Sequence, residues 1–305
     1  MATFKELLKV SYKSEDTEEW LDVHFTRPVG LVFALFWNKL GVHPNAITIL
    51  SIFFGMGSGW MFHYTDLWHN VWGVVLLMLA NFCDSTDGQM ARLTGKKTLL
   101  GRVLDGFASD VWFFCVYLGL VFRLWNQPIP IPGLDIHWGI LGFVLACVAG
   151  FMSHAPQCAL ADYYRQIHLY FLLGEKGSEL NNYRQQRAIY ESLPHSKWFE
   201  RFYYFNYANY CKGQERRTPN FQRFFAKWRQ QPDESVRQAL LAGSRPLMKY
   251  TNLLTHNLRA YTLFATALLD CPWVYLLFEI VVMNLMCAYM HRQHEKLCAQ
   301  LTERL

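Results

Sequence analysis

The sequence predicts an all-α integral membrane protein. The predicted protein has six transmembrane helices, an N-terminal amphipathic juxtamembrane helix and a cytoplasmic helical insertion between helices 4 and 5. Composition is the first observation: of 305 residues, 52% are hydrophobic and only 17% are charged, against about 25% charged residues in an average soluble domain. The second is a series of apolar segments close to the roughly 20 helical residues that cross a bilayer. The third is an alternation in the charge of the loops between them.

Six apolar segments of the chain are candidate membrane spans. The fifth is the weakest, because it contains His256, Asn257 and Arg259. The six predicted spans lie near residues 46–64, 71–92, 103–124, 138–161, 252–270 and 273–292.

Loop charge predicts the orientation of these spans. The connections HYTDLWHN, NQPIPIPGLDIH and DCP, which follow the first, third and fifth spans, contain no Lys or Arg. The opposite side carries TGKKTLLGR and a long basic segment. Because positive loops stay in the cytoplasm, both termini and these basic segments are expected there. Arg123, near the outer end of the third span, is the exception, and Arg can snorkel to the interface.

The chain divides into four predicted parts. The N-terminal part, MATFKELLKVSYKSEDTEEW onward, has the pattern of a short amphipathic helix followed by an acidic patch, without the apolar core of a cleaved signal. The predicted parts are an N-terminal segment (1–43), helices 1–4 (44–162), a basic aromatic insertion (163–250), and helices 5–6 with the tail (251–305).

The insertion between Tyr163 and Tyr250 carries 15 Lys or Arg against 7 Asp or Glu. Basic and aromatic residues alternate there, which is also a feature of nucleic-acid binding. Between two membrane spans, rings at the interface and cations on lipid phosphates explain the pattern better, so no nucleic-acid partner is expected. The 8 cysteines form no CxxC pair and lie mostly in apolar runs, which indicates reduced thiols and argues against a zinc site or a disulfide framework.

Residues 84–110, DSTDGQMARLTGKKTLLGRVLDGFASD, place four aspartates between two apolar spans. Asp84 and Asp87 are three residues apart and share a helix face, while Asp105 follows the next helix start. Charges at such depth are costly unless they face one another or a polar cavity. Clustered carboxylates repel unless cations lie between them. Their oxygen ligands suit hard divalent ions, so we expect Mg²⁺ or Mn²⁺, as a pair of ions of the kind that assists phosphoryl transfer.

The spacing Asp84-x2-Asp87-Gly88-x2-Ala91-Arg92-x8-Gly101-x3-Asp105 resembles the signature of the CDP-alcohol phosphotransferase (phosphatidyltransferase) family. HPNAITILS, with Asn45 and Thr48 at the start of the first span, is also similar to the family. The resemblance covers about residues 27–165. It implies six transmembrane helices and a cytoplasmic site where an alcohol attacks the β-phosphorus of a CDP-linked donor and CMP leaves.

The resemblance also implies roles for individual residues. It assigns metal binding to the aspartates, and it assigns binding of the CDP moiety to the residues around them. The implied metal ligands are Asp84, Asp87, Asp105 and Asp110, and the implied nucleotide-binding residues are Gly88, Ala91, Arg92 and Gly101, with Asn45 and Thr48. The family's last aspartate is also its general base, so Asp110 and Asp105 are the predicted catalytic residues.

The sequence departs from the family at this last aspartate. Four residues after Asp105 stands Ser109, and Asp110 comes one residue later. On a regular helix, position 109 lies about 40° from Asp105 and position 110 about 140° away. Three interpretations remain: a π-bulge returns Asp110 to the site; Ser109 fills the position while another group or water takes the proton; or the site binds nucleotide without catalysis. We favour the first.

The resemblance also implies an acceptor pocket beside the metals, among the cytoplasmic halves of the later spans. The acceptor-binding candidates there are Arg165, His256 and Arg259. An intramembrane Arg is a functional candidate by default and binds phosphate bidentately. The alternative is that Arg259 pairs with a structural partner such as Asp162 or with lipid phosphate.

The predicted function is transfer of a phosphatidyl group from CDP-diacylglycerol to a small polar alcohol, with inositol phosphate or inositol as the first candidates. One alternative is transfer of a CDP-linked head group such as phosphoethanolamine to a lipid hydroxyl. A second, from another class, is a non-catalytic CDP-binding membrane protein. The partners expected are the donor, the acceptor and membrane lipid, and the family resemblance adds a homodimer.

Overall fold

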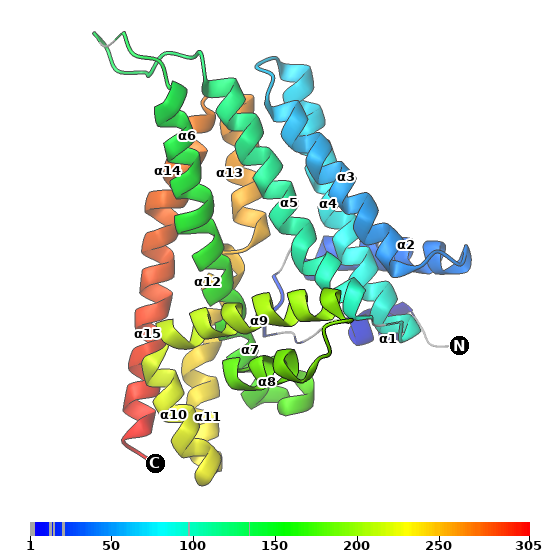
Figure 1. Ribbon diagram of the computed structural model, residues 1–305, viewed down its shortest axis with the longest axis vertical. Helices are drawn as coiled ribbons and strands as arrows, with labels where there is room; N and C mark the ends of the chain where they lie inside the picture. The colour runs from blue at the N-terminus through cyan, green and yellow to red at the C-terminus, as the bar shows by residue number, and fades with distance from the viewer. Residues whose placement is uncertain (1–3, 12–13, 15, 20–21, 97, 134) are drawn as a thin grey trace. The chain divides into compact units, whose positions relative to one another are not determined.

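The computed structural model describes residues 4–11, 14, 16–19, 22–96, 98–133 and 135–305, and every regular element in this part of the chain is helical (Figure 1). The main helices are α1 (Phe4–Ser11), α2 (Arg27–Lys39), α3 (Pro44–Phe62), α4 (Leu67–Thr94), α5 (Leu99–Leu124), α6 (Gly139–Cys147), α7 (Ala155–Leu173), α8 (Tyr183–Ser192), α9 (Trp198–Arg217), α10 (Pro219–Gln230), α11 (Glu234–Ser244), α12 (Met248–Leu253), α13 (His256–Leu268), α14 (Pro272–Phe278) and α15 (Asn284–Thr302). The all-α prediction is confirmed.

Within the described residues, four helices are long and apolar enough to cross a membrane, so the chain is a multi-pass membrane protein. They are Pro44–Phe62, Leu99–Leu124, Gly139–Leu173 and Pro272–Thr302. They overlap the predicted spans 46–64, 103–124, 138–161 and 273–292.

The other two predicted spans are not among these four helices. Residues 71–92 lie in α4, which is long but carries Asp84, Asp87 and Arg92. Residues 252–270 do not form one helix: α12 ends at Leu253, and α13 has 13 residues, about 20 Å at 1.5 Å per residue. This is short of the roughly 30 Å of a bilayer core, so the count of six spans remains a prediction.

The chain forms two compact units, which are described separately. Unit 1 comprises Met1–Ala155 and His256–Val282, and unit 2 comprises Pro156–Thr255 and Met283–Leu305. Two of the boundaries fall at π-helical stretches, Val148–His154 and Glu279–Met283. The division of the chain into four parts by sequence remains a prediction.

Unit 1 is built around the contact between α3 and α5. A Cβ on Gly119 would come 2.1 Å from the carbonyl oxygen of Gly59, and a Cβ on Gly59 would come 2.4 Å from the carbonyl carbon of Cys115. Gly55 likewise meets the ring of Trp112, where a Cβ would come 2.0 Å from Cδ1. Small residues allow such close approach of membrane helices, so the two backbones touch here.

This contact fixes how α5 is aligned with α3. Asn45 lies against Gly101 near one end of the pair, and Gly59 lies against Cys115 further along. The interval from Asn45 to Gly59 on α3 and the interval from Gly101 to Cys115 on α5 are both 14 residues. The two helices therefore run parallel, and neither contains an extra residue between these two contacts.

At the end of α5 remote from Asp105, a buried arginine connects three elements of unit 1. Arg123 Nη1 donates a hydrogen bond to Asn70 Oδ1 (2.7 Å), and Nη2 donates to Ala267 O (3.1 Å) and Asp270 Oδ1 (2.6 Å). Its side chain is fully buried, so it is paired inside the protein and does not snorkel as we expected from the sequence.

In unit 2, α15 is the helix against which α10, α11 and α12 pack. Glu295 of α15 is buried and accepts hydrogen bonds from the backbone amides of Asn220 (2.8 Å) and Phe221 (3.2 Å) at the start of α10. The helices α8 to α11 belong to the predicted basic insertion, so this segment is a folded helical structure.

We expect Gly119→Ala to destabilise the protein by about 1–3 kcal/mol, because the new methyl group overlaps the Gly59 carbonyl. The measurement is the thermal unfolding midpoint of the purified protein in detergent. Gly106→Ala, in the same helix, is the matched control because, apart from its own stretch of helix, no described heavy atom lies within 4 Å of its Cβ position. Equal loss of stability in both variants would contradict the proposed contact.

Candidate functional site

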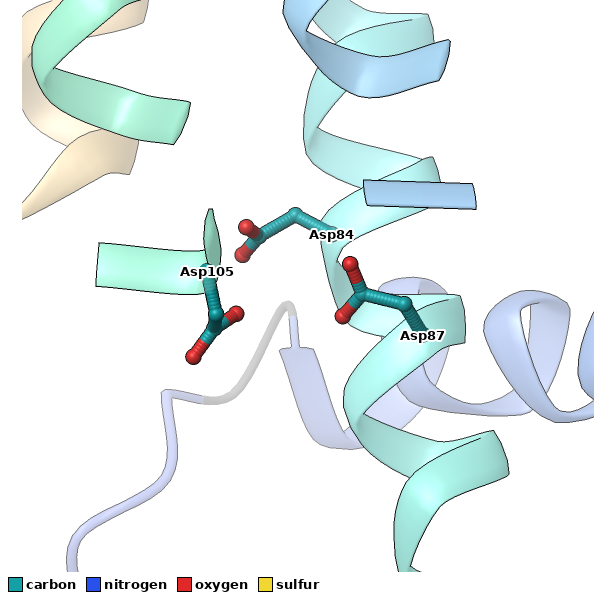
Figure 2. A group of neighbouring side chains, drawn as sticks. All are labelled: Asp84, Asp87 and Asp105. Carbon is teal, nitrogen blue, oxygen red and sulfur yellow. The ribbon is translucent and has the colours of Figure 1, made fainter. Parts of the chain in front are cut away.

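Three aspartates of unit 1 converge where α4 and α5 meet (Figure 2). One carboxylate oxygen from each of Asp84, Asp87 and Asp105 lies within 4.8 Å of the other two. Asp87 is buried, Asp84 is half-buried and Asp105 is exposed, so the group opens on one side. The sequence predicted that these three residues would come together.

The short connection between the helices explains this geometry. Gly95 ends α4 in the left-handed conformation (φ 68°), which favours glycine. Thr98 then caps α5, with its hydroxyl accepting a hydrogen bond from the Gly101 amide (2.9 Å). The chain thus reverses within a few residues and carries Asp105 back to the level of Asp84.

The carboxylates fit a cation. Three negative groups this close repel one another strongly in a partly apolar site. Asp87 Oδ2 is buried and has no hydrogen-bond partner among the described residues, which is costly for a carboxylate oxygen. Oxygen donors of this kind suit a hard divalent ion, so these residues can hold a metal.

Arg92, one of the predicted nucleotide-binding residues, lies near the carboxylates and acts electrostatically on Asp84 and Asp87. The guanidinium of Arg92 lies against Gly88, with Nη1 3.4 Å from the position of a Cβ there. Its Nε and Nη2 are buried and have no partner among the residues that the structure describes. Donors left unpaired beside a carboxylate group are suited to an incoming anion. Ala91 is half-buried one position before Arg92.

Helix α3 supplies the other side of the site. The side chain of Asn45 lies over Gly101, where a Cβ would come 2.8 Å from Asn45 Oδ1. Thr48 is buried, donates a hydrogen bond to Pro44 O (3.3 Å) and lies beside Asp87. Gly101 therefore admits the Asn45 side chain, and its role in nucleotide binding remains a prediction.

Arg27 is a neighbour of the site that the sequence reasoning missed. It acts electrostatically on both Asp84 and Arg92. Its guanidinium makes two hydrogen bonds to Glu18, at 3.2 and 3.1 Å. The pattern of α2 alone gave no signal for this, because the contact depends on how α2 packs on α4.

Asp110 does not join the three aspartates. Helix α5 is regular from Leu99 to Leu124, without the π-bulge that we expected. The equal 14-residue steps between Asn45 and Gly59 and between Gly101 and Cys115 explain this, because a bulge would add a residue to α5 alone. Asp110 therefore lies about 140° around the helix axis from Asp105, and Ser109 lies about 40° from Asp105. Asp110 is exposed, Ser109 is half-buried, and His154 acts electrostatically on Asp110.

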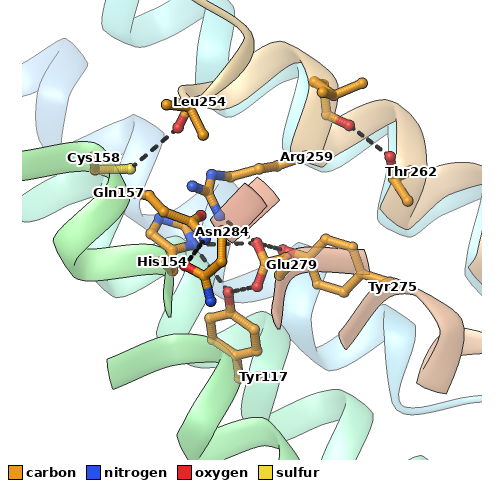
Figure 3. A network of polar contacts seen from close by, with 11 residues as sticks. Tyr117, His154, Gln157, Cys158, Leu254, Arg259, Thr262, Tyr275, Glu279 and Asn284 are labelled. Atoms are coloured by element: carbon orange, nitrogen blue, oxygen red, sulfur yellow. Dashed lines mark hydrogen bonds and ion pairs between the residues drawn. The ribbon is translucent and has the colours of Figure 1, made fainter. Parts of the chain in front are cut away.

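The acceptor candidate Arg259 lies in a second polar group of unit 1 (Figure 3). Its Nη1 is 2.6 Å from Glu279 Oε1, and both side chains are fully buried. Tyr275 donates a hydrogen bond to Glu279 Oε1 (2.8 Å), and Tyr117 donates one to Oε2. His154 Nδ1 lies 3.5 Å from Glu279 Oε1. The partner of Arg259 is therefore Glu279, where the sequence suggested Asp162.

The two other acceptor candidates have different surroundings. His256 packs its ring against Trp112 and Phe113, with centroids 6.1 and 5.8 Å away. Arg165 belongs to unit 2 and donates a hydrogen bond to Asn252 Oδ1 (3.0 Å). An acceptor-binding role for these residues remains a prediction.

The buried ion pair gives a stability prediction. Glu279→Gln leaves Arg259 buried without a counter-charge, so we expect a loss of about 3–5 kcal/mol. Replacing both residues, as Arg259→Met with Glu279→Met, removes the uncompensated charge and should cost less than either single change. The thermal unfolding midpoints of Glu279→Gln, of the single variants Arg259→Met and Glu279→Met, and of the double variant test this. A double variant as unstable as the sum of the singles would show that the two side chains do not act as a pair.

The carboxylate group gives a metal-binding prediction. Mn²⁺ should bind the purified protein and raise its unfolding midpoint, because the cation offsets the repulsion between the aspartates. Asp87→Asn should weaken Mn²⁺ binding at least about tenfold, since it removes a charged ligand from the group. Titration followed by Mn²⁺ electron paramagnetic resonance measures both proteins.

Asp110→Asn is the matched control, because it removes the same charge from the same stretch outside the group. Its Mn²⁺ affinity should equal that of the unmodified protein. A loss as large as that of Asp87→Asn would return Asp110 to the metal ligands.

Comparison with known proteins agrees with this geometry. Residues 41–163 match the model of the family described as CDP-alcohol phosphatidyltransferase. The chain is 34% identical over 101 residues to a phosphatidylinositol phosphate synthase of Streptomyces avermitilis, covering 33% of this chain and 39% of that protein. It is 26% identical over 118 residues to an uncharacterized protein of Aquifex aeolicus, covering 39% of this chain and 52% of the relative. The matches thus span about half or less of each relative. The part of the chain that is similar to the CDP-alcohol phosphatidyltransferase family, residues 41–163, holds the three aspartates and the Arg92 guanidinium beside them.

Proposed function

We propose that this protein moves a phosphatidyl group from CDP-diacylglycerol to a small polar alcohol and releases CMP. The observation that carries the proposal is that buried hydrogen-bond acceptors and donors without described partners occur at the same site. Among the residues that the structure describes, no hydrogen-bond partner is found for the buried acceptor Asp87 Oδ2 or for the buried donors Arg92 Nε and Nη2. A divalent cation bound to a diphosphate would supply both.

Inositol phosphate is the acceptor we propose first, with inositol second. The support is the similarity to a protein named phosphatidylinositol phosphate synthase. Arg259, proposed from the sequence to bind an acceptor phosphate, is already paired with Glu279. The acceptor phosphate would therefore need another cation of the chain.

In the proposed reaction, the alcohol oxygen forms a bond to the β-phosphorus of the donor. The bond from that phosphorus to the bridging oxygen breaks, and CMP leaves with this oxygen. Asp84, Asp87 and Asp105 would hold Mg²⁺ or Mn²⁺, whose charge stabilises the phosphoryl oxygens. Arg92 would bind the diphosphate, and Asn45 and Thr48 would fix the helix α3 side of the donor.

The proton of the alcohol needs a separate account, because Asp110 lies off the carboxylate group. Ser109 stands nearest to the position of the family's last aspartate. We propose that its hydroxyl orients a water molecule that relays the proton from the alcohol to a phosphate oxygen of the departing CMP. In this arrangement, Asp110 is dispensable for the chemistry.

We further propose six membrane spans, with α4 and the α12–α13 segment completing the four long apolar helices. The carboxylates and both termini would lie on the cytoplasmic side. The support is the absence of Lys and Arg from the three connections assigned to the other side.

The test is CMP release from CDP-diacylglycerol with Mg²⁺ or Mn²⁺, using inositol, inositol phosphate, glycerol phosphate, serine and no acceptor. We expect release with inositol phosphate. Asp105→Asn should lower the rate at least about 100-fold through loss of metal-assisted charge stabilisation. Asp110→Asn should change it less than about threefold, whereas loss of a general base costs about 100-fold or more.

The other outcomes identify the alternatives. A rate loss of 100-fold in Asp110→Asn with intact Mn²⁺ binding would make Asp110 the base. Release only with CDP-ethanolamine and diacylglycerol would support head-group transfer to a lipid hydroxyl. Metal-dependent CDP binding without release in any mixture would support the non-catalytic protein.

A further inference from the structure

Unit 2 contains a cavity of about 390 Å³ between the end of α11, the start of α12 and one face of α15. Its volume is in the range of small-ligand sites. On one side a Cβ on Gly243 would come 2.7 Å from Leu297, so the α11 backbone closes directly onto α15. The polar residues that line it are Lys249, Tyr250, Tyr289, Gln293, Lys296 and Gln300.

The lining is basic and rich in hydrogen-bond donors. Among the described residues that line it, Lys249 and Lys296 are the charged ones and none is a carboxylate. Glu295, the one acidic residue in the sequence of α15, is buried and accepts the amides of Asn220 and Phe221. The positive charge of the cavity is therefore not neutralised from its own helix, and such a site favours an anion.

The cavity lies where an apolar helix becomes polar. The rings of Tyr250 and Tyr289 are 5.2 Å apart at its edge, and Tyr289 is near the end of the predicted span 273–292. Lys296 follows seven residues later, about 10 Å further along α15. Tyr side chains gather at the membrane interface, and Lys side chains just beyond it contact anionic lipid headgroups.

We propose that this cavity binds the phosphate headgroup of an anionic phospholipid, apart from the carboxylate site. The phosphate would lie between Lys249 and Lys296, with Gln293 and Gln300 as further donors. The tyrosine pair would cover the glycerol end, where the acyl chains enter the membrane. Lys249 is already held at the cavity by the ring of Tyr250, with Nζ 5.1 Å from its centroid.

The test uses the full chain in detergent and measures its affinity for phosphatidylglycerol, with phosphatidylcholine as the zwitterionic comparison. Lys249→Gln with Lys296→Gln should weaken phosphatidylglycerol binding about 30-fold, from the usual contribution of two lysines near a headgroup. Phosphatidylcholine binding should not change.

Lys176→Gln with Lys197→Gln is the matched control, because both are exposed lysines of unit 2 outside the cavity. It should keep its affinity within about threefold, as expected for distant surface charges. Equal weakening in both double variants would overturn the proposal, and so would unchanged binding in Lys249→Gln with Lys296→Gln. Competition with glycerol 3-phosphate distinguishes the two possible sources of the phosphate group. If glycerol 3-phosphate displaces phosphatidylglycerol, the ligand of the cavity is a soluble phosphate compound. If it does not, the ligand is a lipid.

Discussion

The contact between α3 and α5 is the constraint on which the rest of unit 1 depends. Because Gly59 and Gly119 bring the two backbones together, neither helix can slide along the other without a clash. The same alignment places Asn45 over Gly101 at the other end of the contact. The position of Asp105 relative to Asp84 therefore depends on the contact between Gly119 and Gly59, which lies 14 residues further along α5. It also depends on the loop that joins α4 to α5.

The carboxylate site was largely predictable from the sequence. The spacing of Asp84 and Asp87 follows from helical periodicity, and the cost of unpaired charge beside apolar spans requires Asp105 to join them. These are local arguments, and they succeeded. Much of the helical architecture was predictable for the same reason, since the length and apolarity of a span are properties of one segment.

The partners of buried polar groups were not predictable in this way. Arg259 and Glu279 are 20 residues apart, on α13 and at the end of α14, and only the packing of these helices shows that they meet. Glu279 is the only acidic residue in the predicted span 273–292, which was a signal that could have pointed to this pair. The expected bulge at Asp110 was wrong because sequence spacing alone does not reveal the α3 contact, which holds α5 to a regular helix.

Arg123 lies 18 residues after Asp105 on α5, about 27 Å along the helix axis. At its end of unit 1, hydrogen bonds within the protein join α5 to α4 and to the turn after α13. At the other end, the short loop joins α4 to α5 although Asp84 and Asp87 of α4 lie close to Asp105 of α5. Like charges at this distance repel one another. The two ends of this helix pair therefore differ in their electrostatics: the Arg123 end contains its own counter-charge, whereas a bound cation would relieve the repulsion at the carboxylate end.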